Sequence, residues 1–265
     1  MSLPAPTADN RAVVTGSSSG IGTALAEELA SRGYSLILVA RREDLLNQLA
    51  EKLSAKYGIT AEVRAVDLSN REQRAPLAKE LADRDIAILC NNAGVATFGP
   101  LAKLDLDYER DIMELNAVAV HDLSLAVLPG MLKRRAGGIL ITGSAAGNMP
   151  IPNNATYAAS KAFTNSFSES LRGEVKNSGI NVTLLAPGPV RTDNPDQEEV
   201  GNKIPEFIWV TAAHTAKITI DALARNKMRV VPGLISKGMS LVGQFGPRSL
   251  TSPVAGAMYK KLGES

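Results

Sequence analysis

Short apolar runs alternate along this chain with longer amphipathic segments. The runs begin near residues 11, 34, 60, 86, 137, 180 and 228, and each is continuous or nearly continuous in apolar residues. Strands that are covered on both faces have this composition, because neither face meets water. In segment 42–58, by contrast, Leu45, Leu46, Leu49 and Leu53 recur at the spacing of an amphipathic helix. The pattern therefore predicts seven strands separated by helices.

This order of elements predicts the α/β class, with a doubly wound parallel sheet and helices on both faces. Parallel strands need right-handed crossovers long enough to hold a helix, and the amphipathic segments supply them. A length of 265 residues suits a single domain, which we place at residues 11–265 after an N-terminal tail of residues 1–10. Ligands of such sheets bind beyond the carboxyl ends of the strands, so the residues that follow each run are the candidates for chemistry.

Composition argues against several other classes. A net charge of +2 with 45% hydrophobic residues gives neither the basic surface that nucleic acid requires nor the charge excess of a disordered chain. The single cysteine, Cys90, excludes an internal disulfide and predicts inert core, and no Cys/His spacing offers a metal site. Residues 1–10 lack the features of a signal peptide, and no run of about 18 or more apolar residues is present. We expect a reduced, cytoplasmic protein whose membrane contact is at most peripheral.

The segment TGSSSGIG, residues 15–22, follows the first run and opens the first predicted helix. Its glycines permit a tight turn and the close approach of a pyrophosphate, whose charge would meet backbone N–H groups and the positive end of the helix dipole. We therefore expect a dinucleotide's phosphates at Gly16, Ser18, Ser19, Gly20, Ile21 and Gly22.

The second run ends in Ala40, Arg41 and Arg42, at the position that selects between the two nicotinamide dinucleotides. An acidic residue there would accept hydrogen bonds from a free ribose 2′-hydroxyl, whereas a guanidinium pairs with a 2′-phosphate. The sequence thus favours NADP(H), with Arg41 as the preferred contact. The alternative is that the two arginines are merely solvated at the start of a helix.

The third run ends in Asp67 and Leu68, which can border an adenine. Asp67 can equally cap the next helix, together with Ser69 or Asn70. Small or amide residues after the fourth and sixth runs complete the predicted rim of the site: Asn92, Ala93 and Gly94, and then Pro187, Gly188, Val190 and Thr192. The first of these groups can approach a ribose, pin neighbouring strands or form a turn without a ligand.

Tyr157 and Lys161 are four positions apart in the segment YAASK, so on a helix they share one face. Ser144 ends the fifth run, where its hydroxyl can donate to a substrate oxygen or simply form a turn. A free tyrosine has a pKa of about 10. A neighbouring ammonium that stabilises the phenolate would therefore make this phenol a better proton donor near neutral pH.

Together these motifs resemble the short-chain dehydrogenase/reductase family. TGSSSGIG, NNAG at 91–94, Asn116, Ser144, YAASK and PGPVRT at 187–192 occur in the family's order and spacing, from Arg11 to about Gly233. The resemblance implies a Rossmann-type sheet of seven strands and a homodimer or homotetramer. It also implies a role for each of four residues: Tyr157 as general acid, Lys161 as a ribose ligand that lowers the pKa of the tyrosine, Ser144 as a carbonyl contact and Asn116 as part of a proton relay. Within the family, the region after the second run and the basic C-terminal tail look similar to actinobacterial ketoacyl and mycolate-precursor reductases.

Two segments bear on the substrate. Residues 193–215 sit where family members place a substrate-covering loop, and Ile204, Phe207, Ile208 and Trp209 can line a pocket or only anchor that loop. Residues 234–265 form a C-terminal extension that mixes apolar and basic residues, as a contact with a subunit, a membrane or a lipid substrate would.

We therefore expect an NADPH-dependent reductase of a small-molecule or lipid-like carbonyl substrate, a 3-oxoacyl compound or another long apolar ketone. The first alternative is an NADP-dependent dehydrogenase of a steroid-like or other secondary alcohol. The second is an NADPH-binding regulator or scaffold without turnover.

Overall fold

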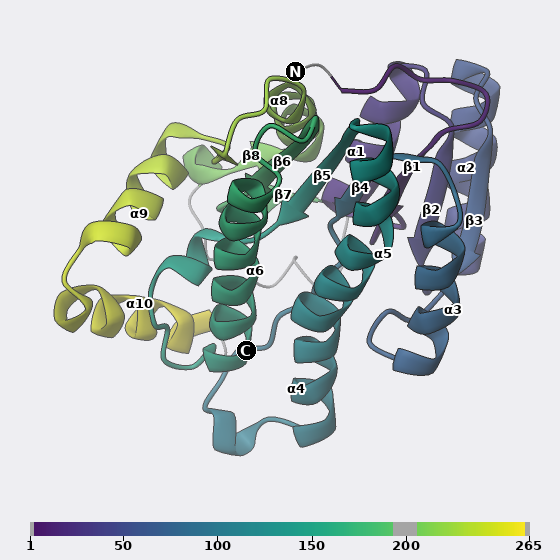
Figure 1. Ribbon diagram of the computed structural model, residues 1–265. Helices are drawn as coiled ribbons and strands as arrows, with labels where there is room; N and C mark the ends of the chain where they lie inside the picture. Colours follow the sequence, from purple (N-terminus) through teal and green to yellow (C-terminus); the bar gives the residue numbers. More distant parts are fainter. Residues whose placement is uncertain (1–2, 193–205, 263–265) are drawn as a thin grey trace.

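Seven parallel strands form one sheet in the computed structural model, which describes residues 3–192 and 206–262 (Figure 1). Their order across the sheet is β3-β2-β1-β4-β5-β6-β9. The strands are β1 (Arg11–Thr15), β2 (Leu36–Ala40), β3 (Ala61–Ala65), β4 (Ile86–Asn91), β5 (Gly137–Thr142), β6 (Ile180–Leu185) and β9 (Arg229–Val230). Each lies in one of the seven predicted apolar runs, so the predicted α/β fold is confirmed.

Helices cover both faces of the sheet. In chain order the helices of the described residues are α1 (Gly20–Ser31), α2 (Glu43–Tyr57), α3 (Arg71–Ala82), α4 (Leu106–Met113), α5 (Ala119–Arg134), α6 (Ala155–Glu174), α8 (Ala212–Ala224), α9 (Leu234–Phe245) and α10 (Arg248–Leu262). Helices α1, α2 and α8 pack on one face through residues such as Leu25, Leu46 and Ile220. Helices α3, α5 and α6 pack on the other through Leu81, Leu123 and Leu171. Alternate residues of each strand enter the two cores, which explains why the strands are apolar throughout.

The direction of winding reverses at β1, because β1 pairs with β2 on one side and with β4 on the other. The connections on the two sides of this point run to opposite faces of the sheet, so a crevice forms beyond the carboxyl ends of β1 and β4. TGSSSGIG and NNAG follow these two strands. The fold therefore brings two of the predicted motifs to one crevice.

A long continuous helix runs from Leu106 to Arg134 and consists of α4, a π-helical turn (Glu114–Val118) and α5. By length and hydropathy alone it could cross a membrane. In the structure it packs along the sheet, with Leu123, Val127 and Met131 buried against the strands. Its apolar character is therefore accounted for by the core of this domain.

The remaining segments refine the predicted boundaries. The N-terminal tail is packed rather than free, since the Tyr34 hydroxyl donates to the Pro4 carbonyl at 2.6 Å. Of the predicted substrate loop, residues 193–205 lie outside the described residues, and α8 already begins at Ala212. Two short strands that the sequence did not predict, β7 (Val190–Arg191) and β8 (Val210–Thr211), pair with each other in this region. Cys90 is buried, and burial raises the pKa of its thiol to about 12.

Candidate active site

The glycine-rich turn after β1 fits an anionic ligand. Gly16 has a φ of +67°, and a Cβ on it would lie 2.8 Å from the Ala93 Cα. A Cβ on Gly22 would lie 2.0 Å from the Gly16 carbonyl oxygen, so only glycine lets α1 start this close to the turn. No described side chain caps the first turn of α1. Its first N–H groups are therefore available to a phosphate, as the predicted dinucleotide requires.

Arg42 lies beside this turn and donates to the Ser18 hydroxyl from Nη2 at 2.9 Å and from Nε at 3.3 Å. Arg41 is exposed at the same rim and also lines the cavity. Asp67 is the sole carboxylate among the described residues that line the cavity. The preference for Arg41 over Arg42 stays a prediction, and the hydrogen bonds to Ser18 make Arg42 an equal candidate.

The contacts of Asp67 and Asn92 show what these side chains bind within the protein, and their contacts with a dinucleotide stay predictions. Asp67 lines the cavity and also accepts from the Ser69 N–H and hydroxyl, while Asn70, not Asp67, caps α3. The Asn92 amide donates to the Thr15 carbonyl at 3.0 Å and its oxygen accepts from the Thr142 hydroxyl at 3.4 Å. Asn92 thus pins β1, β4 and β5 together and faces the cavity as well.

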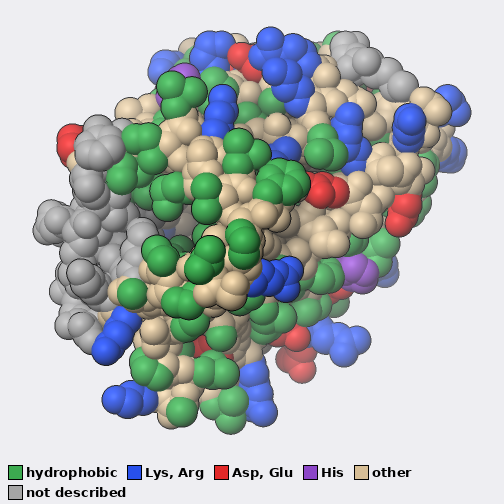
Figure 2. All heavy atoms as spheres, turned by 90° about the vertical axis from the view of Figure 1, so that its left-hand side faces the viewer, with side chains coloured by type: hydrophobic (Ala, Val, Ile, Leu, Met, Phe, Trp, Pro, Cys, Tyr) green, Lys and Arg blue, Asp and Glu red, His purple; other side chains and the backbone are tan. Residues whose placement is uncertain are grey.

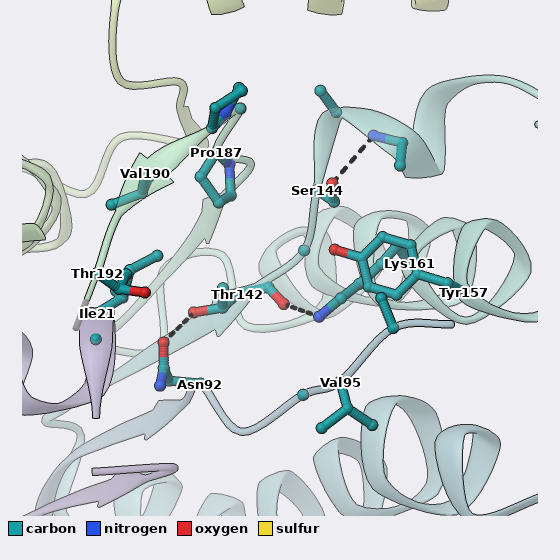
Figure 3. A pocket seen from close by; sticks show the side chains of 18 of the residues that line it. Ile21, Asn92, Val95, Thr142, Ser144, Tyr157, Lys161, Pro187, Val190 and Thr192 are labelled. Atoms are coloured by element: carbon teal, nitrogen blue, oxygen red, sulfur yellow. Dashed lines mark hydrogen bonds between the residues drawn. The ribbon is translucent and has the colours of Figure 1, made fainter. Parts of the chain in front are cut away.

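Tyr157 and Lys161 lie on one face of α6 and point into the cavity, as their spacing predicts (Figure 3). The Lys161 ammonium donates to the Thr142 carbonyl at 2.9 Å and lies 5.7 Å from the centre of the Tyr157 ring. Ser144 lies opposite, in the turn after β5, and its hydroxyl accepts from the Ala146 N–H at 3.1 Å. Three predicted catalytic residues are therefore brought together from β5 and α6.

Burial dominates the titration of this pair. It raises the pKa of Tyr157, and a side-chain hydrogen bond with Ser144 lowers it in part. Burial also lowers the pKa of the Lys161 ammonium to about 8. The sequence-based expectation was a lowered tyrosine pKa caused by Lys161. In this arrangement the pKa of Tyr157 moves upward instead, and Ser144 is the group that opposes the shift.

Asn116 sits in the π-helical turn, fully buried, and holds the segment after β4 against α6. Its amide donates to the Val95 carbonyl at 2.9 Å and to the Ser160 hydroxyl at 3.1 Å, and its oxygen accepts from the Val95 N–H at 3.0 Å. A Cβ on Gly94 would lie 3.0 Å from the Asn116 oxygen and 3.1 Å from the Lys161 ammonium. Asn116 is thus near the lysine, with its side chain already engaged, and its part in a proton relay stays a prediction.

A single large cavity of about 1400 Å³ connects these groups. Every predicted site residue lines it except Gly22 and Asn116, which lie behind its wall. Its other end is apolar and includes residues that sequence reasoning missed: Phe98, Met149, Ile151, Met239, Val254 and Tyr259. Of the four loop residues proposed for the pocket, Trp209 lines it, Ile208 does not, Ile204 lies outside the described residues, and the Phe207 side chain is not described.

Tyr259 is the most distant of these additions in the sequence. It stands on α10, its ring centre is 5.9 Å from that of Phe98, and it packs in the same small cluster as Tyr157. Burial, and then the nearby Tyr157, raise its pKa. No spacing in the sequence links Tyr259 to YAASK, so only the fold reveals that a second phenol lies close to Tyr157 in the cavity.

A family model described as short chain dehydrogenase matches residues 10–202. The chain belongs to the short-chain dehydrogenase family. With the motifs and the sheet order in place, the predicted membership is confirmed. The family model ends before α8, so the apolar wall that α9 and α10 form lies outside the matched part.

Named relatives agree with this assignment. Over 185 residues the chain is 38% identical to the very-long-chain 3-oxoacyl-CoA reductase of Bos taurus, covering 68% of this chain and 59% of the relative. It is 39% identical over 184 residues to the human inactive hydroxysteroid dehydrogenase-like protein 1, covering 68% of this chain and 56% of the relative. The chain thus matches about three fifths of the length of these curated relatives.

Among solved structures, a short-chain dehydrogenase from Sphingobium yanoikuyae in complex with NADPH aligns with a TM-score of 0.80 and 30% identity. The alignment covers 89% of this chain and 92% of that one. The likeness therefore extends over nearly the whole domain, beyond the residues that the family model matches.

Proposed function

We propose that this protein is an NADPH-dependent reductase of a long apolar ketone, with a 3-oxoacyl thioester as the favoured substrate class. The observation that carries the proposal is the position of Tyr157 and Ser144. They stand where the glycine-rich, arginine-flanked end of the cavity meets its apolar end. At this junction the Tyr157 phenol and the Ser144 hydroxyl can donate hydrogen bonds to the oxygen of a substrate carbonyl, while the carbonyl carbon faces a nicotinamide.

The residues present fit NADPH. The uncapped first turn of α1 and the turn at Gly16 suit the pyrophosphate, and Arg41 and Arg42 suit a 2′-phosphate. Lys161 reaches the cavity from α6, where it can donate to ribose hydroxyls. The bound cofactor would supply the hydride to the carbonyl carbon. The NADPH-bound Sphingobium structure and the absence of an acidic residue directly after β2 in the sequence support this choice.

Side chains of the protein supply the proton for the reduction. Ser144 and Tyr157 both present hydroxyls to the same point, so the substrate oxygen can accept a hydrogen bond from each. As hydride reaches the carbon, the Tyr157 O–H bond breaks and its proton passes to the oxygen, which becomes the hydroxyl of the product. The raised pKa of Tyr157 keeps the phenol protonated before this step. Solvent then returns a proton to the tyrosine.

The apolar end of the cavity supports a long substrate. Met149, Met239, Val242 and Val254 line it, and at about 1400 Å³ the cavity exceeds the usual volume of a single small-molecule pocket, about 300–1,000 Å³. A dinucleotide and an acyl chain can therefore be held together. The name of the bovine relative, a very-long-chain 3-oxoacyl-CoA reductase, agrees with this substrate class.

The human relative is named as inactive, so likeness to such proteins does not by itself establish turnover. NADPH oxidation should therefore be measured with 3-oxoacyl thioesters of increasing chain length, a steroid ketone and short ketones. A kcat/KM that rises with acyl length supports the proposal. A preference for the steroid ketone would favour the alcohol dehydrogenase alternative, and tight NADPH binding without turnover on any ketone would favour the scaffold.

We further propose a homodimer formed by the face of α4, α5 and α6. Exposed apolar side chains on this face support it: Met113, Leu125 and Phe163, the last stacked on Phe167 with ring centres 5.6 Å apart. Light scattering of the purified chain tests this assembly. A monomer at micromolar concentration would contradict it, and Leu125→Glu should convert a dimer to a monomer.

A further inference from the structure

Helix α9 is packed with its polar side inward. Its buried residues are Ser236, Ser240 and Gly243, which recur at helical spacing. The opposite face carries the large apolar residues, and these are turned to the outside: Leu234, Ile235, Met239, Leu241, Val242 and Phe245. Leu234 is 84% exposed and Phe245 is 75% exposed. This arrangement is the reverse of that of a surface helix on a water-soluble core, so the outer face of α9 is suited to an apolar environment.

Helix α10 continues the same surface. Leu250 and Val254 are one turn apart on it and are 68% and 72% exposed. Figure 2 looks onto this side of the molecule and shows hydrophobic side chains gathered around a hollow. We name the surface formed by Leu234, Leu241, Val242, Phe245, Leu250 and Val254 the apolar platform. Soluble monomers rarely expose apolar residues in such a contiguous group, which indicates an interaction site.

The segment that carries the apolar platform contains basic residues and no acidic ones. From Ala222 to Leu262 the sequence has seven Lys or Arg residues and no Asp or Glu. Lys237 on α9 and Arg248 at the start of α10 are exposed beside the platform. A second copy of the chain docked on the platform by a two-fold contact would bring Lys237 and Arg248 close to the same cations of the other copy, which is unfavourable. An anionic lipid surface instead complements both the cations and the apolar residues.

The apolar platform is also continuous with the active-site cavity. Val242, Leu250 and Val254 belong to the platform and line the cavity as well. A lipid surface seated on the platform would therefore meet the apolar end of the cavity. A long acyl chain could then move from the bilayer to Tyr157 with little exposure of its apolar surface to water.

We propose that the apolar platform of α9 and α10 docks the protein onto the surface of an anionic bilayer. The contact is peripheral: the apolar side chains enter the boundary between headgroups and acyl chains, and Lys237 and Arg248 meet lipid phosphates. It delivers an apolar substrate to the cavity mouth. Docking itself needs neither NADPH nor turnover, so this proposal can fail while the proposed reduction stands, and the reverse also holds.

Flotation of the full chain with vesicles tests the proposal. Vesicles of phosphatidylcholine with phosphatidylglycerol should carry the protein at low salt, vesicles of phosphatidylcholine alone should carry much less, and high salt should release it. Leu241→Ser with Phe245→Ser removes two platform residues that do not line the cavity. We expect this double variant to lose at least about tenfold in vesicle partitioning, while it keeps the wild-type kcat/KM on a short water-soluble ketone. Met228→Ser, at an exposed methionine directly before β9 and outside the platform, is the control and should float like the wild type.

Two double variants with reversed charges distinguish electrostatic attraction to anionic lipid from nonspecific adsorption to vesicles. Lys237→Glu with Arg248→Glu should abolish the preference for anionic vesicles, whereas Lys133→Glu with Lys176→Glu, exposed on other elements, should retain it. Failure of the wild type to float with anionic vesicles, or equal flotation of the wild type and the Leu241/Phe245 variant, would overturn the proposal. The proposal would also be overturned if the wild type formed a dimer, did not bind vesicles, and became a monomer when Leu241 and Phe245 were replaced. The platform would then be a subunit contact.

Discussion

The Lys161 ammonium lies 5.7 Å from the centre of the Tyr157 ring and is fixed there by the Thr142 carbonyl at 2.9 Å. The pair therefore has little freedom: a backbone oxygen of β5 sets the position of the cation, and the cation lies beside the phenol. Lys161 is buried and Tyr157 is partly buried, so their interactions act in a medium of lower dielectric constant than water. This relationship carries the first two predictions.

Tyr157→Phe should remove the proton donor and leave the cavity otherwise unchanged. General acid catalysis is worth about 10²–10⁴-fold, so kcat should fall by about a thousandfold. The Kd for NADPH, measured by fluorescence, should stay within about twofold of the wild type, since most of the predicted cofactor contacts lie elsewhere. Tyr259→Phe is the matched control in the same cavity and should keep most of the activity. A Tyr157→Phe variant that turns over at a near-normal rate would show that another group protonates the carbonyl.

Lys161 should make stability depend on pH in a defined window. Its pKa is 10.5 ordinarily and about 8 in the folded state, because burial disfavours the charge. Between these values the unfolded chain binds more protons, so the folded state gains stability as the pH rises. Relative to Lys161→Met, the free energy of unfolding of the wild type should increase by on the order of 2–3 kcal/mol between pH 7 and 10.5.

Urea unfolding of both proteins across this range measures that difference. Comparing the two proteins cancels the other titrating groups, and any constant offset from the lost hydrogen bond to Thr142 also cancels from the slope. A difference that does not change with pH would mean that Lys161 titrates near its ordinary value. Loss of the charge should also lower kcat/KM of the wild type as the pH passes about 8.

Arg41→Ser and Arg42→Ser, tested singly, should decide which arginine binds the 2′-phosphate. Charge-assisted hydrogen bonds contribute about 1.5–3 kcal/mol, so the responsible variant should bind NADPH about 10–100-fold more weakly and NADH nearly unchanged. Arg71→Ser, at an exposed arginine outside the cavity lining, is the control. If each single variant weakens the binding of NADPH and NADH by the same factor, neither arginine binds the 2′-phosphate.

The sequence predicted the fold and most of the residues that line the cavity, because both depend on local patterns. Buried parallel strands must be apolar throughout, and ligand-binding residues must follow them, so reading the ends of the runs found Gly16, Asn92 and Ser144 without coordinates. The pairing of β7 with β8 was missed because each strand has only two residues. The pocket wall from α9 and α10, including Tyr259, was missed because helices that leave the sheet can pack in many ways with the same pattern.

The direction of the Tyr157 pKa was missed for a different reason. The spacing in YAASK identifies which charge lies near the phenol, but it contains no information on burial. In the folded protein the desolvation of the phenol outweighs its favourable contacts. Sequence patterns thus identified the chemical groups, and the three-dimensional structure was needed to weigh them.

The sequence pattern also gave no indication of the role of Asn165. This residue lies one turn after Lys161 on α6 and binds the turn that carries Ser144. Its amide donates to the Ser144 carbonyl at 3.0 Å and to the Asn148 oxygen at 3.2 Å, and its oxygen accepts from the Ser144 N–H at 3.4 Å. A Cβ on Gly143 would lie 2.0 Å from that oxygen, so the turn fits closely around it. Asn165 is therefore a positioning residue for Ser144.

Asn165→Leu should lower kcat by about tenfold with the Kd for NADPH unchanged, because a buried peptide group loses its partners and Ser144 shifts. Asn165→Asp supplies the sharper test. Its carboxylate would face the Ser144 carbonyl and the Asn148 oxygen, so activity at pH 8 should be low, whereas the protonated acid can donate to them as the amide does. The ratio of variant to wild-type kcat should therefore rise as the pH falls from 8 to 5. The control is Ser168→Ala on the same helix. The Ser168 hydroxyl is buried and has no hydrogen-bond partner among the described residues, so the ratio of variant to wild-type kcat should not change with pH. A flat ratio for Asn165→Asp as well would mean that Asn165 contributes only to stability.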